Sequence, residues 1–480
     1  MKTFFDSEDI YDCMNELAKS KVEGKTYRLI FKMNERIRIK IKTPVGTTET
    51  EEAGSGPSQG GVDAAILSSN SMGNGVRDTF TEDDKEVEYA GKIVLRPLTF
   101  MDDIGRLAAD RNAAQYANDK LEDLMSSKGL AFNLDKSKFL IMGNKKSRRK
   151  IQSQLDREPL ELCGKKMPQA KELKYLGDWV SFDLSQSVHT TVMKRLGVAK
   201  LAIYEIRAVV EDRRSEVLGG VTVGLAIWEA TVEPMLYHNA ETWQNISTKT
   251  IKVLKDLYLY FFRCLFRLGA GAPGMNYFWQ CGMLTPDAII LKKKLNFFHH
   301  LANLPENSLA NECFRIQCDS EGEDSLPSIV EEVKEHVSKI GDPTSVSKGV
   351  WKRRVEEFIS NMTRKNLLES MKKYKKINTD EREPFERKNY LQTLNLEDAR
   401  MRMRISMGMV NTVRSNFKQS YKDRSLTCQS CKGIRVGRRD ENEGEKPIDS
   451  QIHLMEDCEA FEDIRRELNI QNDAGIVEFF

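Results

Sequence analysis

The spacing of apolar residues predicts helices along much of the chain. In residues 6–20, apolar side chains recur every three to four positions and give a helix one apolar face, formed by Ile10, Met14 and Leu17. A residue that could cap this helix stands before that face, either Asp6 or Ser7. Similar spacing predicts helices over 62–72 and 110–128.

Strands are predicted where apolar and polar residues alternate, or where a short apolar run stands between turn residues. Residues 27–43 begin apolar and then alternate isoleucine with arginine or lysine. We therefore expect a strand with a basic outer face, which ends at Pro44 and Gly46. Residues 139–142 form a short apolar run, and residues 173–181 have the pattern of a hairpin.

The most informative short motif lies between two other apolar runs. Residues 92–99 predict a buried strand interrupted by Pro97, and residues 104–109 predict a second short strand. The four residues between them would form a hairpin tip: Phe100, Met101, Asp102 and Asp103. Adjacent acids are common in ordinary polar turns. Carboxylates held rigidly at a hairpin tip repel each other unless cations are present, and two Mg²⁺ ions about 3.5–4 Å apart would suit them.

Two other segments have both an ordinary and a functional interpretation. Residues 56–61, Gly-Pro-Ser-Gln-Gly-Gly, precede the predicted helix at 62–72. They are either a flexible linker or a place where the backbone closely approaches a nucleotide or template. Asn133, Lys136 and Ser137 precede the apolar run at 139–142, and Lys136 considered alone would be a solvated charge.

The Gln-Gly loop, the Asp-Asp hairpin and the Asn-x-x-Lys motif follow one another in an order that resembles non-LTR retrotransposon reverse transcriptases. The resemblance implies an RNA-directed DNA polymerase, a nucleotidyltransferase that uses two Mg²⁺ ions. Asp102 and Asp103 would be its catalytic metal ligands, and Lys136 would lie near the leaving phosphates. The hairpin pattern at 173–181 resembles the family's primer grip, and its implied partners are an RNA template and a DNA target or primer.

The same resemblance assigns three residues near the beginning of the chain. Gln59 and Gly60 would contact the template and the nucleotide, although Ser58 interrupts the commoner Pro-Gln-Gly form of the loop. Phe5 stands where the family has an aromatic residue that senses the sugar. The family's first catalytic aspartate would fall one place before Met1, and its fingers domain further upstream. We therefore expect an N-terminally truncated copy with an incomplete metal site.

Four soft metal ligands lie near the C-terminal end. Cys428 and Cys431 form a CxxC pair, and after 21 intervening residues His453 and Cys458 follow as HxxxxC. This set fits one closed tetrahedral Zn²⁺ site. We expect the zinc to be structural, because so small a segment with few apolar residues would barely fold without metal. The segment also resembles the C-terminal zinc segment of the same retrotransposons.

Composition excludes some classes of protein. The chain has 480 residues, 40% of them hydrophobic and 30% charged, and its net charge is only +2. No apolar segment is long enough for a leader or a membrane span, and nine scattered cysteines fit a reducing compartment, so we expect the nucleus or cytoplasm. Basic runs at 144–158 and 348–424 would suit nucleic acid, or would be a solvated connection and a solvated helical bundle.

These patterns predict an α+β fold, and the resemblance to the polymerase family divides it into five parts. They are a partial polymerase palm with an antiparallel sheet (1–143), a basic connection with a primer-grip-like hairpin (144–187), a helical thumb (188–305), an acidic loop with a basic helical region (306–424) and a zinc-knuckle-like tail (425–480). The favoured function is the polymerase, expected to be inactive as it stands. The alternative is a catalytically dead remnant that binds nucleic acid, and a helical scaffold is the third.

Overall fold

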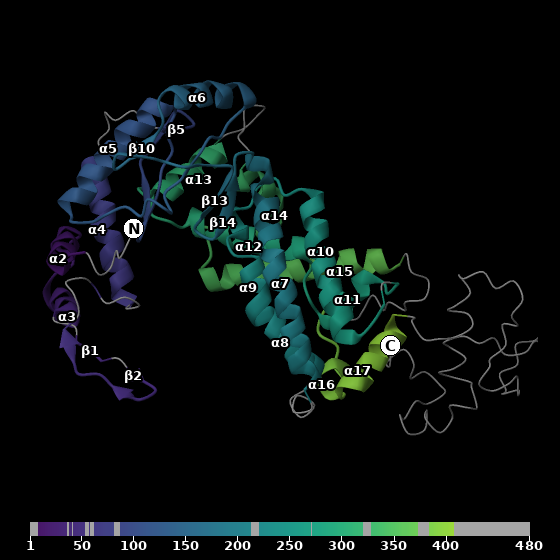
Figure 1. Cartoon of the computed structure of the whole chain (residues 1–480). Coiled ribbons are helices and arrows are strands. Elements are labelled where there is room, and N and C mark those ends of the chain that lie inside the picture. Colours follow the sequence, from purple (N-terminus) through teal and green to yellow (C-terminus); the bar gives the residue numbers. More distant parts are fainter. Residues whose placement is uncertain are drawn as a thin grey trace, which may run out of the picture. The chain divides into compact units, whose positions relative to one another are not determined.

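A computed structural model describes residues 8–35, 38–40, 42–52, 57, 62–80, 87–212, 220–269, 271–319, 328–372 and 384–407. The chain forms two compact units, Met1–Thr191 with Pro305–Asp324, and Val192–Leu304 with Ser325–Phe480. Helices predominate in both units, and the strands form small sheets (Figure 1). The predicted α+β class is therefore confirmed. None of the described helices is long and apolar enough to cross a membrane.

The helices of the first unit are α2 (Ile10–Lys19), α3 (Gly24–Asn34), α4 (Val62–Thr79), α5 (Arg111–Ser127), α6 (Lys145–Arg157) and α13 (Leu309–Asp319). A short 3₁₀ helix, η1 (Leu184–Gln186), leads into α7 (Ser187–Glu211), whose residues from Val192 onward belong to the second unit. The apolar side chains of α4 and α5 face each other and form one buried cluster, made of Met72, Val76, Phe80, Ala117, Leu121, Leu124, Met125 and Leu130. This cluster supports the strands that follow α4.

Each described strand pairs with a single partner, so the described strands do not build one wide sheet. The antiparallel pairs are β1 (Arg38–Ile39) with β4 (Glu51–Glu52), β2 (Lys42–Thr43) with β3 (Gly46–Thr47), β5 (Val87–Tyr89) with β6 (Ile93–Leu95), β7 (Leu98–Phe100) with β8 (Asp103–Gly105), β10 (Glu161–Leu162) with β11 (Lys165–Lys166), and β13 (Glu172–Tyr175) with β14 (Asp178–Ser181). One pair is parallel, β9 (Phe139–Leu140) with β12 (Gln169–Ala170).

The first predicted helix is present, but its cap differs from the prediction. Ile10, Met14 and Leu17 of α2 are buried as expected. The helix begins later than predicted because Asp9 caps it, accepting a hydrogen bond of 2.7 Å from the Tyr11 backbone N–H.

The strand predicted over 27–43 is wrong for its first half, which forms α3. Tyr27, Ile30 and Phe31 recur at helical spacing and pack against the α2 cluster. Tertiary packing therefore decides a segment whose pattern fits both periods. Only β1 and β2 remain of the predicted strand, and β2 turns into β3 between Thr43 and Gly46, as the Pro44 and Gly46 signals predicted.

The basic run after residue 143 forms helix α6. Asn144 caps it by accepting a hydrogen bond of 2.9 Å from the Ser147 N–H. The helix carries exposed basic side chains on its first turns: Lys145, Lys146, Arg149 and Lys150. The predicted hairpin at 173–181 is present as β13 and β14.

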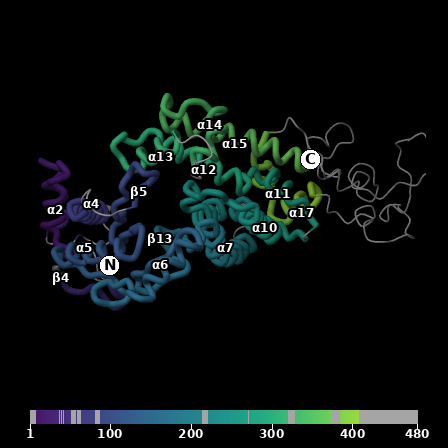
Figure 2. The backbone as a smooth tube through the Cα atoms, turned by 90° about the horizontal axis from the view of Figure 1, so that it is seen from above, coloured from purple at the N-terminus to yellow at the C-terminus, as the bar shows by residue number. Residues whose placement is uncertain are grey.

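The second unit is helical around an aromatic core. Its elements are α8 (Gly220–Ile227), the π-helical turn η3 (Trp228–Val232), α9 (Glu233–Leu236), η4 (Ala240–Thr242), α10 (Thr248–Phe266), α11 (Gly274–Cys281), α12 (Pro286–Ala302), α14 (Ile329–Ile340), α15 (Lys348–Met371), α16 (Tyr390–Thr393) and α17 (Leu396–Ser406). Figure 2 shows α10, α11 and α17 gathered together. Trp228 stacks on Phe261 with ring centroids 4.2 Å apart, and Phe262 stacks on Tyr277 at 5.2 Å. The helical region predicted from 188 to about 303 is confirmed.

Candidate active site

The two aspartates lie at the tip of a tight hairpin. Phe100 pairs with Asp103, Thr99 with Ile104 and Leu98 with Gly105, so only Met101 and Asp102 form the turn. Met101, the first central residue, has a φ of 54° in the left-handed region, whereas Asp102 is not among the residues with positive φ, so the turn is not of type I′. The predicted hairpin is present, although β8 begins at Asp103 itself.

The two faces of this hairpin have different surroundings. Ile104 packs against the core cluster of α4 and α5. Thr99, directly opposite Ile104, faces the same helices, because a side-chain carbon added at Gly73 of α4 would stand 3.8 Å from the Thr99 hydroxyl. On the other face, Leu98 and Phe100 are 50% and 52% exposed. The prediction of a buried strand is therefore wrong for β7, since helices cover only one side of the pair.

Asp103 lies on the open face, beside a second hairpin. Because directly paired residues share a face, Asp103 lies on the same side as Gly105 and Phe100. The ring of Tyr175, from β13, covers Gly105 so closely that a Cβ there would stand 2.5 Å from the Tyr175 hydroxyl oxygen. Burial, together with the negative charge of Asp103, raises the pKa of Tyr175. A protonated phenol is therefore held near the aspartate.

The tyrosine is positioned by a second two-residue hairpin turn. Tyr175 pairs with Asp178, and Leu176 and Gly177 form the two-residue turn between them with φ values of 46° and 91°. Both central residues thus have positive φ, as a type I′ turn needs. Thr191 fixes this hairpin to the start of α7 by accepting a hydrogen bond of 2.8 Å from the Trp179 N–H.

Lys136 lies on a separate turn of the first unit. The Asn133 side-chain oxygen accepts from the Lys136 N–H at 3.3 Å, and the Asn133 carbonyl accepts from the same N–H at 3.1 Å. The Ser137 hydroxyl donates to that carbonyl at 2.9 Å. The Asn-x-x-Lys-Ser motif is therefore a self-bonded turn just before β9, and it leaves the Lys136 side chain exposed.

Several predicted site residues lie outside the described residues. They are Phe5, Gln59 and Gly60, and the four zinc ligands Cys428, Cys431, His453 and Cys458. Within the described ranges, no three or more His, Cys, Asp or Glu side chains gather to hold a metal ion. Asp102 and Asp103 alone still fit Mg²⁺, which proteins commonly hold through one or two carboxylates while water and phosphates complete the shell.

Sequence reasoning missed the contact between Tyr175 and Gly105. A glycine inside a predicted strand was the available signal, because such a glycine often marks close approach by another group. No protein-family model matches this sequence, and no curated protein matches it either. The resemblance to a polymerase family therefore rests on the sequence motifs.

Proposed function

We propose that this chain carries palm and thumb elements of a reverse transcriptase of the non-LTR retrotransposon type, an RNA-directed DNA polymerase. The observation that carries the proposal is the position of Asp102 and Asp103 at the tip of a two-residue hairpin. That hairpin is backed by α4 and α5 on one face and has Tyr175 on the other. A rigid tip with one open face suits metal ions and a primer end.

Each residue around the tip would have its own role in nucleotidyl transfer. Asp102 and Asp103 would hold Mg²⁺, which when bound helps to activate the primer 3′-hydroxyl and to stabilise the leaving pyrophosphate. Tyr175 is a positioning residue: its protonated hydroxyl stands beside Asp103 without adding a charge. The exposed Lys136 side chain would neutralise the leaving phosphates.

Exposed cations support nucleic-acid partners. Helix α6 presents Lys145, Lys146, Arg149 and Lys150 to solvent within the first unit. Such a basic helix would follow the phosphate backbone of an RNA template or a DNA primer, with an affinity that falls steeply as salt rises. Helices α7, α10 and α12 would belong to the thumb.

The residues predicted near the two ends of the chain complete the proposal. Gln59 and Gly60 would contact template and nucleotide, and Phe5 would sense the sugar. Cys428, Cys431, His453 and Cys458 would hold one structural Zn²⁺. Metal analysis of the purified chain should then find about one zinc per molecule, lost in Cys431→Ser but kept in Cys163→Ser, whose thiol lies on the exposed β10–β11 turn.

The second candidate is a catalytically dead protein that binds nucleic acid. It is favoured by the absence, within the described ranges, of a third ligand grouped with the two aspartates. A two-metal site with only two carboxylates would be weak, so we expect the chain by itself to extend a primer slowly at most.

Primer extension separates the two candidates. A DNA primer on an RNA template is incubated with deoxynucleotides and Mg²⁺ or Mn²⁺. Any extension by the wild-type chain should fall by at least about 10²-fold in Asp102→Asn and in Asp103→Asn. Asp123→Asn removes a charge from an exposed site on α5 and should leave extension unchanged. Extension that survives Asp102→Asn would refute the proposed site, and salt-sensitive binding without any extension would establish the second candidate.

A further inference from the structure

The hairpin that carries Asp102 and Asp103 is small. β7 and β8 form three residue pairs, and in the described part of the chain neither strand pairs with a third strand. An isolated two-stranded hairpin is only marginally stable in water, and adjacent carboxylates repel each other. The position of the two aspartates therefore depends on contacts that join this hairpin to other elements of the first unit.

β8 has the closer contacts of the two strands. On β7, Leu98 and Phe100 are half exposed. On β8, Ile104 packs against the cluster of α4 and α5, and Gly105 is covered by the Tyr175 ring on the opposite face. The strand that begins with an aspartate is thus held between two helices and a second hairpin.

Arg106, the residue after β8, joins this strand to the first turns of α5. It is half-buried, and its Nη1 and Nη2 donate to the main-chain carbonyls of Ala114 and Ala113, each at 2.8 Å. The planar guanidinium fixes the direction of both bonds, so they set the orientation of the strand end as well as its distance from the helix. Asp110 fixes the same turn of α5 by accepting a hydrogen bond of 2.9 Å from the Ala113 N–H.

We propose that Arg106 is a positioning residue, which holds the Asp102–Asp103 hairpin against α5 and so preorganises the two carboxylates for a divalent metal ion. The role in metal binding rests on the proposed function, whereas the anchoring of the hairpin does not. Without the guanidinium the hairpin moves more freely and its carboxylates separate under their mutual repulsion. Metal binding must then order the hairpin as well, so the affinity falls although no metal ligand is lost.

A titration of the full chain with Mn²⁺, followed through the EPR signal of free Mn²⁺, tests this role. The binding that is present in the wild type and absent in Asp102→Asn/Asp103→Asn belongs to the hairpin. Arg106→Ala should weaken this binding at least about fivefold, because the order of the hairpin is lost. Arg106→Lys keeps the charge but not the planar pair of donors, so its affinity should lie between those of the wild type and Arg106→Ala.

Arg111→Ala is the matched control. Arg111 also donates to two consecutive main-chain carbonyls, those of Glu158 and Pro159, at 3.1 and 3.0 Å. It belongs to α5 and to the same unit, but it joins that helix to the segment before β10 and not to the hairpin. This variant should change the hairpin's affinity for Mn²⁺ by less than about twofold.

Amide hydrogen exchange of the chain without added metal separates the anchoring from the metal chemistry. Measured by mass spectrometry, peptides that cover residues 98–105 should exchange at least about tenfold faster in Arg106→Ala, because two hydrogen bonds from a charged donor no longer oppose opening. In Arg111→Ala, exchange of the same peptides should stay as in the wild type.

Several results would overturn the proposal. One is tighter Mn²⁺ binding in Arg106→Ala, which is expected if the arginine charge only repels the cation. Others are equal losses of affinity in Arg106→Ala and Arg111→Ala, and unchanged exchange of residues 98–105 in Arg106→Ala. If the wild type binds no Mn²⁺ through Asp102 and Asp103, the proposed function fails, and with it the role of Arg106 in metal binding. Exchange of residues 98–105 then still decides whether Arg106 holds the hairpin.

Discussion

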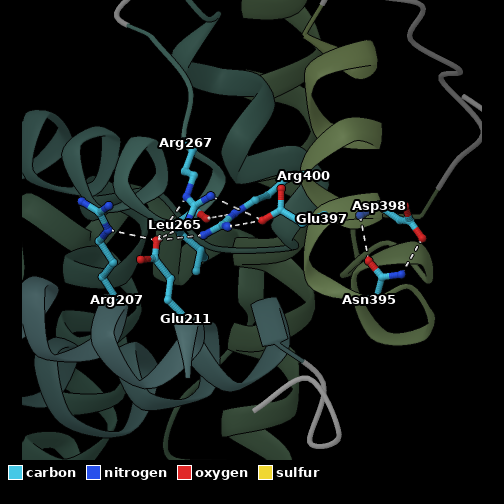
Figure 3. A network of polar contacts seen from close by, with 8 residues as sticks. All are labelled: Arg207, Glu211, Leu265, Arg267, Asn395, Glu397, Asp398 and Arg400. Atoms are coloured by element: carbon cyan, nitrogen blue, oxygen red, sulfur yellow. Dashed lines mark hydrogen bonds and ion pairs between the residues drawn. The ribbon is translucent and has the colours of Figure 1, made fainter. Parts of the chain in front are cut away.

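Arg400 of α17 is buried and donates from its Nε to the main-chain carbonyl of Leu265 near the end of α10, at 2.9 Å. Its other nitrogens reach Glu397 at 2.7 Å and Glu211 at 3.4 Å (Figure 3). Glu211 lies at the end of α7, so one guanidinium joins three helices of the second unit. Each of its three nitrogens has a partner, which is how a buried arginine is tolerated.

Removal of this guanidinium should destabilise the second unit. Arg400→Ala leaves the buried Leu265 carbonyl without its donor and Glu211 without one of its cationic partners. We therefore expect a loss of about 3 kcal/mol in the free energy of unfolding. Arg267→Ala is the matched control, since Arg267 also pairs with Glu211 and Glu397 but its side chain is 45% exposed. That change should cost less than about 1 kcal/mol. Urea unfolding measures both, and equal losses would contradict this account.

Glu233 should make stability depend on pH. Burial raises its pKa from 4.5 to about 7, while the Tyr258 hydroxyl, which donates to Glu233 at 2.8 Å, opposes part of the rise. The neighbouring charge of Glu229 also raises it, and Lys292 lowers it. Because the folded pKa is raised, this contribution to stability is complete below pH 4.5 and is lost as pH rises to about 7.

Glu233→Gln isolates this effect. Urea unfolding of the wild type should show a loss on the order of 3 kcal/mol from this group between pH 4.5 and 8. Glu233→Gln should remove that part of the pH dependence, because the amide does not ionise. Glu335→Gln changes an exposed carboxylate paired with Lys339. It should leave the pH dependence of the free energy of unfolding above pH 5 unchanged. An unchanged slope in Glu233→Gln would refute the assignment.

The close approach of Tyr175 to Gly105 predicts strong coupling between these positions. Gly105→Ala places a methyl group where the Tyr175 ring end now lies, so we expect a loss of about 1–3 kcal/mol. Tyr175→Leu removes the clashing ring end, and the double variant should lose less than the sum of the two single variants. Gly197→Ala, on α7 with nothing within 4 Å of the added carbon, should be neutral or stabilising. If the double variant loses as much stability as the two single variants together, Gly105 and Tyr175 are not in close contact.

Local signals explain how much of the site was predictable. The Asp102–Asp103 hairpin follows from two apolar runs, a proline and a short polar turn, all within residues 92–109. The Asn133 turn is also local, because the side chain bonds the backbone three residues later. The apolar pattern of residues 27–33 fits both a strand and a helix, and packing against α2 stabilises the helix.

Contacts between distant segments were not predictable from one sequence. Tyr175 lies 70 residues beyond Gly105, and nothing in either segment specifies the other. Arg400 belongs to a stretch that composition suggested to be a solvated basic face, yet it is buried by α7 and α10.

The most direct measurement of the central claim is metal binding at the hairpin tip. The full chain, labelled at methionine and isoleucine methyl groups, is titrated with Mn²⁺ in place of Mg²⁺ while NMR signals are followed. Met101 and Ile104 flank the aspartates, so their methyl signals should broaden first. Asp102→Asn/Asp103→Asn should abolish this, and Asp123→Asn should not. Broadening that persists in the double variant, or none at Met101 and Ile104 in the wild type, would contradict a metal site at this hairpin.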